Sequence, residues 1–153
     1  MSEPIILSII LVVSFVGITI FRTKELPESI SAMVWSLKGD WKWLWSVWLM
    51  AVSILTFVPM IEILDRKDVG ILGFLPMVCL CFVAVWPLFD SEHTKLHNGL
   101  AILGGILSQL CVLLINPYWL LLWLLMPIAL LDKSKSVMIA ECICYVAIIG
   151  ALI

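Results

Sequence analysis

The chain has 153 residues, of which 63% are hydrophobic and only 13% are charged, with a mean hydropathy of +1.18 and a formal net charge of −2. A water-soluble domain is about half apolar, and so few polar residues cannot cover the apolar surface that this composition would leave exposed. Composition therefore excludes a soluble globular domain, and no basic cluster indicates nucleic acid as a partner. We predict an all-α helical bundle in a membrane, with membrane lipids as its surroundings.

Long apolar segments, separated by short polar ones, predict a single domain of about six transmembrane helices. The first segment, residues 4–21, has no basic residue before it and no small-residue cleavage site after it, so we expect a retained helix rather than a cleaved signal peptide. The segment at 116–131 is short for a span, so a re-entrant segment and five spans in all are the alternative. The remaining spans are expected at residues 43–64, 70–89, 98–115 and 137–153.

The connection between the first two segments predicts a short amphipathic helix over residues 27–38. Pro27 suits a first helical turn, and apolar residues follow at helical spacing. These are Ile30, Met33, Val34 and Leu37. The segment is too short to span, so it either lies in the membrane interface or packs beneath the bundle, and the two placements are compatible.

Tryptophan and lysine gather where the second span begins. Indole rings prefer the headgroup level, and lysine side chains can extend beside them, so an aromatic belt that anchors the helix is the simplest interpretation. The same lysines would attract an anionic headgroup. We therefore predict a surface that binds lipid or a membrane partner, formed by Trp35, Lys38, Trp41, Lys42 and Trp45.

Lysine and arginine are unevenly divided between the two sides of the predicted bundle. Seven lie in the loops after the first, third and fifth segments, whereas Arg66 and Lys67 are the two on the other side. Basic loops stay in the cytoplasm, so both termini are expected outside and the polar stretch at residues 90–98 inside.

Two histidines in that polar stretch are candidate metal ligands and catalytic residues. If the fourth helix begins near residue 92, His93 and His97 share one face. Glu141 lies near the start of the sixth segment, which begins on the same side of the membrane. Glu92 or Asp90 could add an oxygen ligand. The spacing lacks the glutamate of a zinc-protease motif, so solvated histidines and a glutamate that extends to the interface are one alternative. Another is a hydrogen-bonding role, in which His97 or Asn98 ties the fourth segment to a neighbouring helix. No cofactor is predicted.

Polar residues within apolar segments are candidates for an ion path. Glu62, Gln109 and Glu141 lie at different depths and could mark a route for protons or cations, although a single glutamine is more typical of an interhelical hydrogen bond. Gly104 and Ser108 are four residues apart, a spacing that lets another helix approach closely. This face could join a homo-oligomer or a membrane partner.

The five cysteines all fall inside apolar segments. The pairs Cys79/Cys81 and Cys142/Cys144 are two residues apart, which rotates their side chains by about 200° around a helix. Neither pair shares a face, so we interpret the cysteines as packing residues rather than metal ligands.

Two stretches resemble a known group of proteins: LPESISAMVWSLKGDWKWLWSVW at residues 26–48 and KLHNGLA at residues 95–101. An interfacial segment after the first helix, and a histidine followed by small residues at the start of the fourth, resemble uncharacterised small six-helix bacterial membrane proteins of about this length. The resemblance implies a six-helix bundle, no settled chemistry and the bacterial inner membrane as its location. It singles out Ser29, Ile30, Ser31, His97 and Asn98.

No phosphate-binding loop, serine nucleophile elbow or cysteine–histidine constellation is present in the sequence, which favours a role other than catalysis. We predict a small integral membrane protein that binds lipid or a membrane partner. A proton or cation transporter or channel subunit is one alternative, and an intramembrane metal-dependent hydrolase is another.

Overall fold

The computed structural model describes residues 2–37, 41–89 and 94–153, and these ranges contain helices and connecting loops but no β-strand. The predicted all-α fold class is therefore confirmed. The elements, in chain order, are α1 (Glu3–Thr23), the 3-10 helix η1 (Ser31–Ser36), α2 (Lys42–Asp65), α3 (Gly70–Phe89), α4 (Thr94–Ile115), the 3-10 helix η3 (Pro117–Leu125), α5 (Met126–Ala129) and α6 (Ser136–Leu152).

Helices α1 to α4 are long and apolar enough to cross a membrane, judged by length and composition. Few of their side chains are covered by the rest of the chain: the buried share of the most apolar window is 17% in α1 and 44% in α2. Apolar surface left open to this extent is expected of helices that lipid surrounds. Two shorter apolar helices follow, Pro117–Ala129 and Ser136–Leu152, and the count of six spans stays a prediction.

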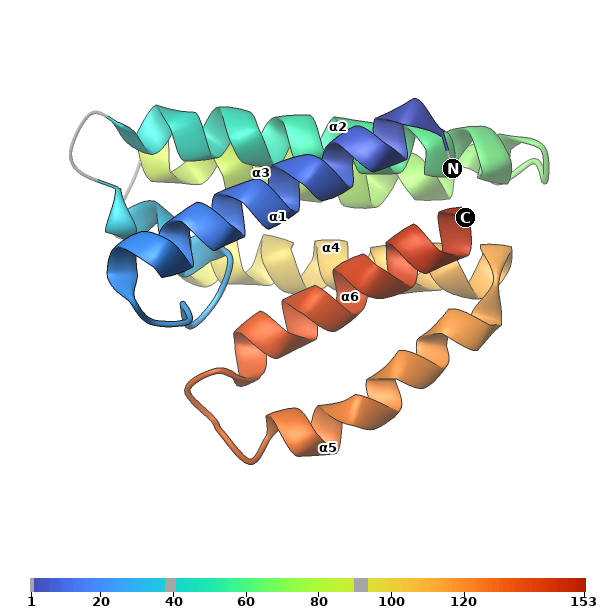
Figure 1. The fold of residues 1–153 in the computed structure, drawn as a ribbon. Helices are drawn as coiled ribbons and strands as arrows, with labels where there is room; N and C mark the ends of the chain where they lie inside the picture. Colours follow the sequence, from blue (N-terminus) through green and yellow to red (C-terminus); the bar gives the residue numbers. More distant parts are fainter. Residues whose placement is uncertain (1, 38–40, 90–93) are drawn as a thin grey trace.

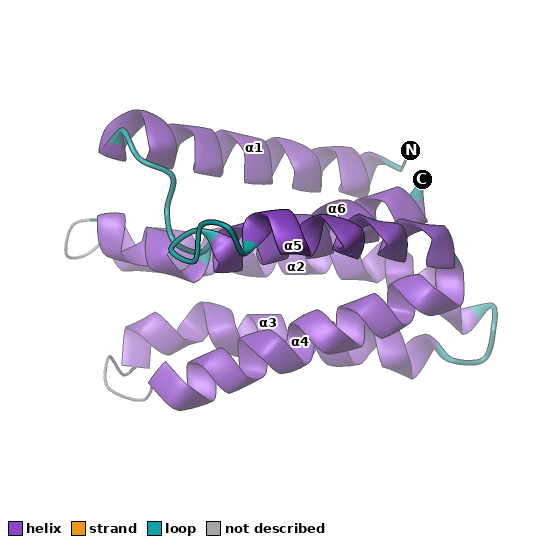
Figure 2. Ribbon diagram, turned by 90° about the horizontal axis from the view of Figure 1, so that it is seen from below, coloured by secondary structure: helices purple, strands orange, loops and turns teal. Residues whose placement is uncertain are grey.

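The helices run back and forth between two ends of the bundle, and both termini lie at the same end (Figure 1). The loops at residues 24–30 and 130–135 lie at the opposite end, which we call the distal end. Neighbouring helices pack in sequence, α1 on α2, α2 on α3 and α3 on α4, while α6 lies against α4 and η3. Figure 2 shows the same layers from below, with α1 at the edge of the bundle.

Two apolar clusters fill the core. The distal cluster joins α2 and α3 to η1, and consists of Met33, Val34, Trp45, Trp48, Leu49, Val52, Val83 and Ala84. The second cluster joins α2, α4 and α6 toward the termini, and consists of Phe57, Met60, Leu64, Cys111, Val112, Ala147, Ile148 and Ala151. The cysteine in this cluster is fully buried, as expected of a packing residue.

The connection after α1 differs from the predicted amphipathic α-helix over residues 27–38. Among the described residues 27–37, Ser31–Ser36 alone is helical, and it is a 3-10 helix whose Met33 and Val34 side chains are buried in the distal cluster. The residues before it are irregular because α6 takes their backbone groups: Glu28 O and Ile30 N both bond to α6 and are not free for an α-helical ladder. Of the two placements expected, the structure shows packing beneath the bundle.

Helices α3 and α4 approach closely at Gly104. A Cβ atom on this glycine would lie 3.1 Å from the Cβ of Cys79 in α3, so a larger residue would push the two helices apart. The close approach predicted from the Gly104/Ser108 spacing thus occurs within the chain. Association of a second copy or a partner through this face stays a prediction.

The fifth apolar segment is mostly a 3-10 helix, not the α-helix expected over residues 116–131. Asn116 begins it, with its side-chain oxygen accepting the Tyr118 N–H at 3.3 Å. Trp119 then lies against Gly150 of α6, where a Cβ atom would overlap the indole ring. This contact fixes η3 to α6 and requires glycine on the α6 side.

Candidate functional site

Residues 26–30 and the first residue of η1, Ser31, which we together call the crossing segment, lie at the distal end and are bound by three helices. Helix α6 and the residue before it provide two of the bonds: the Lys135 ammonium donates to Leu26 O, and Met138 N–H donates to Glu28 O at 3.0 Å. Backbone groups outside regular structure need such partners wherever water is excluded. The start of α6 therefore holds the crossing segment in place.

A short turn sets the position where α6 begins. Ser134 donates to Asp132 Oδ1 through its backbone N–H at 3.0 Å and through its hydroxyl at 2.6 Å. These hydrogen bonds hold the pKa of the exposed Asp132 carboxyl below its usual range. The turn leads directly into Lys135, whose side chain reaches the crossing segment.

Glu141 of α6 accepts a hydrogen bond from the backbone of the crossing segment. Its Oε2 accepts the Ile30 N–H at 2.6 Å, and Ile30 O accepts the Trp45 indole N–H at 3.3 Å. The carboxylate is half-buried and bonded to backbone. Ile30 is thereby held from both sides, by α6 and by α2.

His97 at the start of α4 binds the next residue of the crossing segment. Its Nε2 lies 3.1 Å from Ser31 Oγ, and either atom can donate, depending on the histidine tautomer. Ser29 Oγ accepts the Ala32 N–H, in the first turn of η1, at 3.0 Å. Asn98 is exposed. Two of the residues that the resemblance singles out, Ile30 and Ser31, thus meet Glu141 and His97 here.

The predicted metal site falls partly outside the described residues, because His93, Glu92 and Asp90 all lie there. His97 and Glu141 come to the same place, since they bond to the consecutive residues Ser31 and Ile30. Among the described residues, no group of three or more His, Cys, Asp or Glu side chains could hold a metal ion.

A central cavity of about 1270 Å³ lies between α1, α2, α4 and α6, with α3, η1 and η3 completing its wall. Pockets for drug-sized ligands are typically about 300–1,000 Å³, so this cavity suits something larger. Its wall is mostly aliphatic and aromatic, and the polar side chains in it are Ser31, Ser53, Thr56, Ser108, Gln109, Glu141 and Tyr145. The sequence does not indicate the cavity, because cavity-facing and lipid-facing side chains are both apolar.

A buried group of three hydroxyls ties α1 to the bundle. Ser8 Oγ lies 2.8 Å from Thr56 Oγ1 and 2.8 Å from Tyr145 OH, so one serine of α1 reaches both α2 and α6. Ser8 and Thr56 are almost fully buried. In apolar surroundings such groups need partners, and their mutual bonds fix the α1 side of the cavity.

The three residues of the predicted ion path are not brought together. Glu62 is exposed on α2 and is not part of the cavity wall. Gln109 and Glu141 do line the cavity, but Gln109 is occupied: its Oε1 accepts the Trp123 indole N–H at 3.0 Å, and its Nε2 lies 3.4 Å from Cys144 O. Gln109 therefore acts as an interhelical link between α4, η3 and α6.

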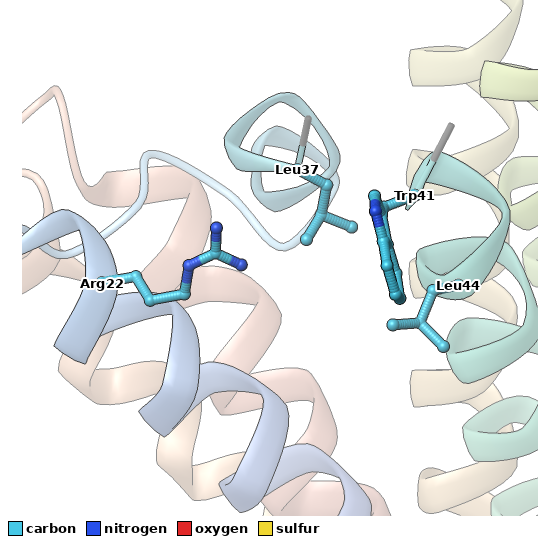
Figure 3. Close-up of a pocket in the computed structure, with 4 residues that line it drawn as sticks. All are labelled: Arg22, Leu37, Trp41 and Leu44. Carbon is cyan, nitrogen blue, oxygen red and sulfur yellow. The ribbon is translucent and has the colours of Figure 1, made fainter. Parts of the chain in front are cut away.

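A second, smaller pocket of about 380 Å³ lies where α1 ends and α2 begins, and is lined by Arg22, Leu37, Trp41 and Leu44 (Figure 3). The Arg22 side chain extends toward this pocket from α1, while the Trp41 ring and Leu44 bound it on the α2 side. Trp41 is 60% exposed. Arg22 lines this pocket, whereas the sequence identifies it only as one of the basic residues in the loop after the first segment.

The other residues of the predicted lipid surface are placed differently. Trp45 is fully buried in the distal cluster, where its indole N–H bonds Ile30 O, and it does not reach the surface. Lys42 is half-buried. Lys38 lies outside the described residues, and the Trp35 side chain is not described. Among the described members of the set, Trp41 is the one that borders an open pocket.

Fold and cavity together define a class: an all-helical chain whose four apolar helices are compatible with a membrane protein and suggest, by composition, a membrane location. Comparison with protein-family models, curated proteins and solved structures finds no match for this chain.

Proposed function

We propose that this chain is an integral membrane protein that binds a long-chain amphiphile of the membrane in its central cavity. The cavity itself carries the proposal: it holds about 1270 Å³ between helices whose outer faces are apolar. A long hydrocarbon chain fits such a space, and its burial is favourable because it removes apolar surface from any water present.

Exposed apolar side chains on three helices border the cavity, which supports the exchange of a ligand between the cavity and the bilayer. Val13 of α1 is 65% exposed, Ile102 of α4 is 64% exposed and Val137 of α6 is 54% exposed, and all three line the cavity. These apolar side chains would face lipid chains in a membrane. An amphiphile can therefore reach the cavity sideways, without passing through water.

We propose six spans, with both termini outside and the distal end in the cytoplasm of a bacterial inner membrane. The common position of the two termini supports an even number of crossings (Figure 1), and the excess of lysine and arginine at the distal end supports the orientation. A 3-10 helix rises about 2.0 Å per residue, so η3 with α5 spans about 24 Å. This length approaches the hydrocarbon thickness of about 30 Å.

The Arg22 pocket supports a second lipid contact, at the membrane surface. A guanidinium beside an exposed indole and two leucines offers a bidentate donor for a phosphate and an apolar surface for the chain below it. We propose that this pocket holds the headgroup of an anionic lipid, which retains the predicted role of Trp41 and adds Arg22 to it.

Filling the cavity tests the main proposal. Gly105 lines the cavity, and a Cβ atom there would meet nothing within 4 Å; Gly99 lies on the same helix, outside the wall, and also has open space around it. Gly105→Trp would place an indole in the cavity, and Gly99→Trp is the matched control. Both lose a helical glycine, so local helix propensity changes equally.

The measurement is the binding of radiolabelled hexadecanol to purified protein in detergent. Wild type and Gly99→Trp should bind it with the same affinity, and Gly105→Trp should lose about tenfold, the equivalent of about 1.4 kcal/mol. Equal binding by all three proteins, or no saturable binding by wild type, would contradict the proposal.

A further inference from the structure

The wall of the central cavity contains an acidic side chain and no basic one among the described residues that line it. Glu141 is the single ionisable acid or base of the Asp, Glu, Lys, Arg and His types among the described residues that line it. A phosphate or carboxylate headgroup would therefore find no cation in that part of the wall and would meet a carboxylate. The electrostatics of the cavity favour a ligand whose polar end is positive.

One oxygen of Glu141 is available to such a ligand. Oε2 accepts the Ile30 N–H, whereas Oε1 has no hydrogen-bond partner among the described residues and is not a fully buried atom. Because Glu141 lines the cavity, Oε1 is the carboxylate oxygen left for a ligand bound there. The neighbouring Ser31 lines the same wall, and its hydroxyl, which bonds to His97, has a further lone pair that can accept a hydrogen bond.

Two basic side chains on the surrounding elements bond to the crossing segment, and the second ring nitrogen of His97, Nδ1, is buried without a hydrogen-bond partner. The Lys135 ammonium, just before α6, donates to Leu26 O, and the His97 ring, on α4, bonds to Ser31. No ion pair to Glu141 is present within the described ranges. A carboxylate without a counter-ion in apolar surroundings is costly, and a ligand ammonium would lower that cost through a charge-assisted hydrogen bond.

We infer that the cavity selects a long-chain amphiphile whose head is a primary ammonium with no adjacent phosphate. The ammonium binds Glu141 Oε1 beside Ser31, and the chain lies along the apolar wall between α1, α4 and α6. This inference rests on the proposed function, since it names the headgroup of the ligand that the cavity holds.

Three probes of equal chain length test it: hexadecylamine, hexadecanol and hexadecanoate, at neutral pH, where the amine is protonated. Each is measured on wild type, Glu141→Gln and Glu62→Gln. The amide oxygen that Glu141→Gln introduces can still accept the Ile30 N–H, so this variant removes charge and keeps the bond to the crossing segment. Glu62 is exposed and outside the cavity wall, so its variant is the matched control.

Wild type and Glu62→Gln should bind hexadecylamine at least about tenfold more tightly than hexadecanol, and hexadecanoate most weakly, since a hydrogen bond to a charged group contributes about 1.5–3 kcal/mol. Glu141→Gln should lose the preference for the amine and keep the hexadecanol affinity.

The failures separate the two proposals. If wild type binds hexadecanol but binds the amine no more tightly, or if the preference survives in Glu141→Gln, the headgroup assignment is wrong and the cavity proposal stands. If none of the three probes binds, the cavity proposal itself fails. If Glu141→Gln does not fold, the ratio of the hexadecylamine and hexadecanol affinities of the wild type still tests the headgroup assignment.

Discussion

Replacing Glu141 by alanine should release the crossing segment locally while leaving the bundle folded. The change removes the acceptor of the Ile30 N–H, which Glu141 Oε2 holds at 2.6 Å, and leaves that donor without a partner in a partly buried position. An unpaired buried donor costs about 1–3 kcal/mol. The other bonds to the segment, from Met138 and Trp45, remain and keep it near its place.

Amide hydrogen exchange measures this loss directly. If local opening becomes easier by about 1.4 kcal/mol, the peptide that contains Ile30 should exchange about tenfold faster, while peptides from the middle of α2 and α3 should not change. Glu141→Gln should keep its protection, because the amide oxygen can accept the same hydrogen bond. Glu62→Ala is the control for loss of an exposed glutamate.

Two outcomes would refute the reasoning. Unchanged exchange at Ile30 in Glu141→Ala would mean that the carboxylate does not hold this amide in the membrane-embedded protein. Faster exchange throughout α2 and α3 would mean that Glu141 stabilises the whole bundle rather than the crossing segment.

Two further predictions concern the surface pocket and the contact between η3 and α6. Arg22→Gln should reduce retention of phosphatidylglycerol in native mass spectra several-fold and leave hexadecanol binding unchanged, because Arg22 lines the small pocket and not the central cavity; unaltered retention would count against an anionic headgroup there. Gly150→Ala should destabilise the protein by about 1–3 kcal/mol, because its Cβ would overlap the Trp119 ring, while Gly17→Ala, which meets nothing within 4 Å, should not. Equal denaturation midpoints for these two variants would show that Trp119 does not pack on α6 as described.

The long helices follow directly from the sequence. An uninterrupted apolar run bounded by charged or turn residues determines both ends of a span, so the predicted segment at 70–89 coincides with α3 (Gly70–Phe89), and residues 43–64 differ from α2 (Lys42–Asp65) by one residue at each end. The conformation of residues 27–38 does not follow from the sequence in this way. Helical spacing does not show which groups elsewhere in the chain compete for their backbone hydrogen bonds. The bonds from α6 to Glu28 and Ile30 decide their conformation.

The candidate site could be predicted in part. Glu141 is conspicuous as an acid within an apolar segment, and the resemblance singles out Ser31 and His97, whose side chains the structure brings within 3.1 Å of each other. The partner of Glu141 is a backbone amide, which no side-chain pattern reveals. The cavity depends on how α1 sits relative to α4 and α6, and a period of 3.6 residues identifies apolar faces without saying which of them face one another.

A structure determined in a lipid bilayer tests the central claim most directly, through the density between α1, α4 and α6. The account predicts an elongated ligand along the cavity, with its polar end within hydrogen-bond distance of Glu141 Oε1. A cavity closed by α1 packing directly on α4 and α6, with no ligand beside Glu141, would contradict it.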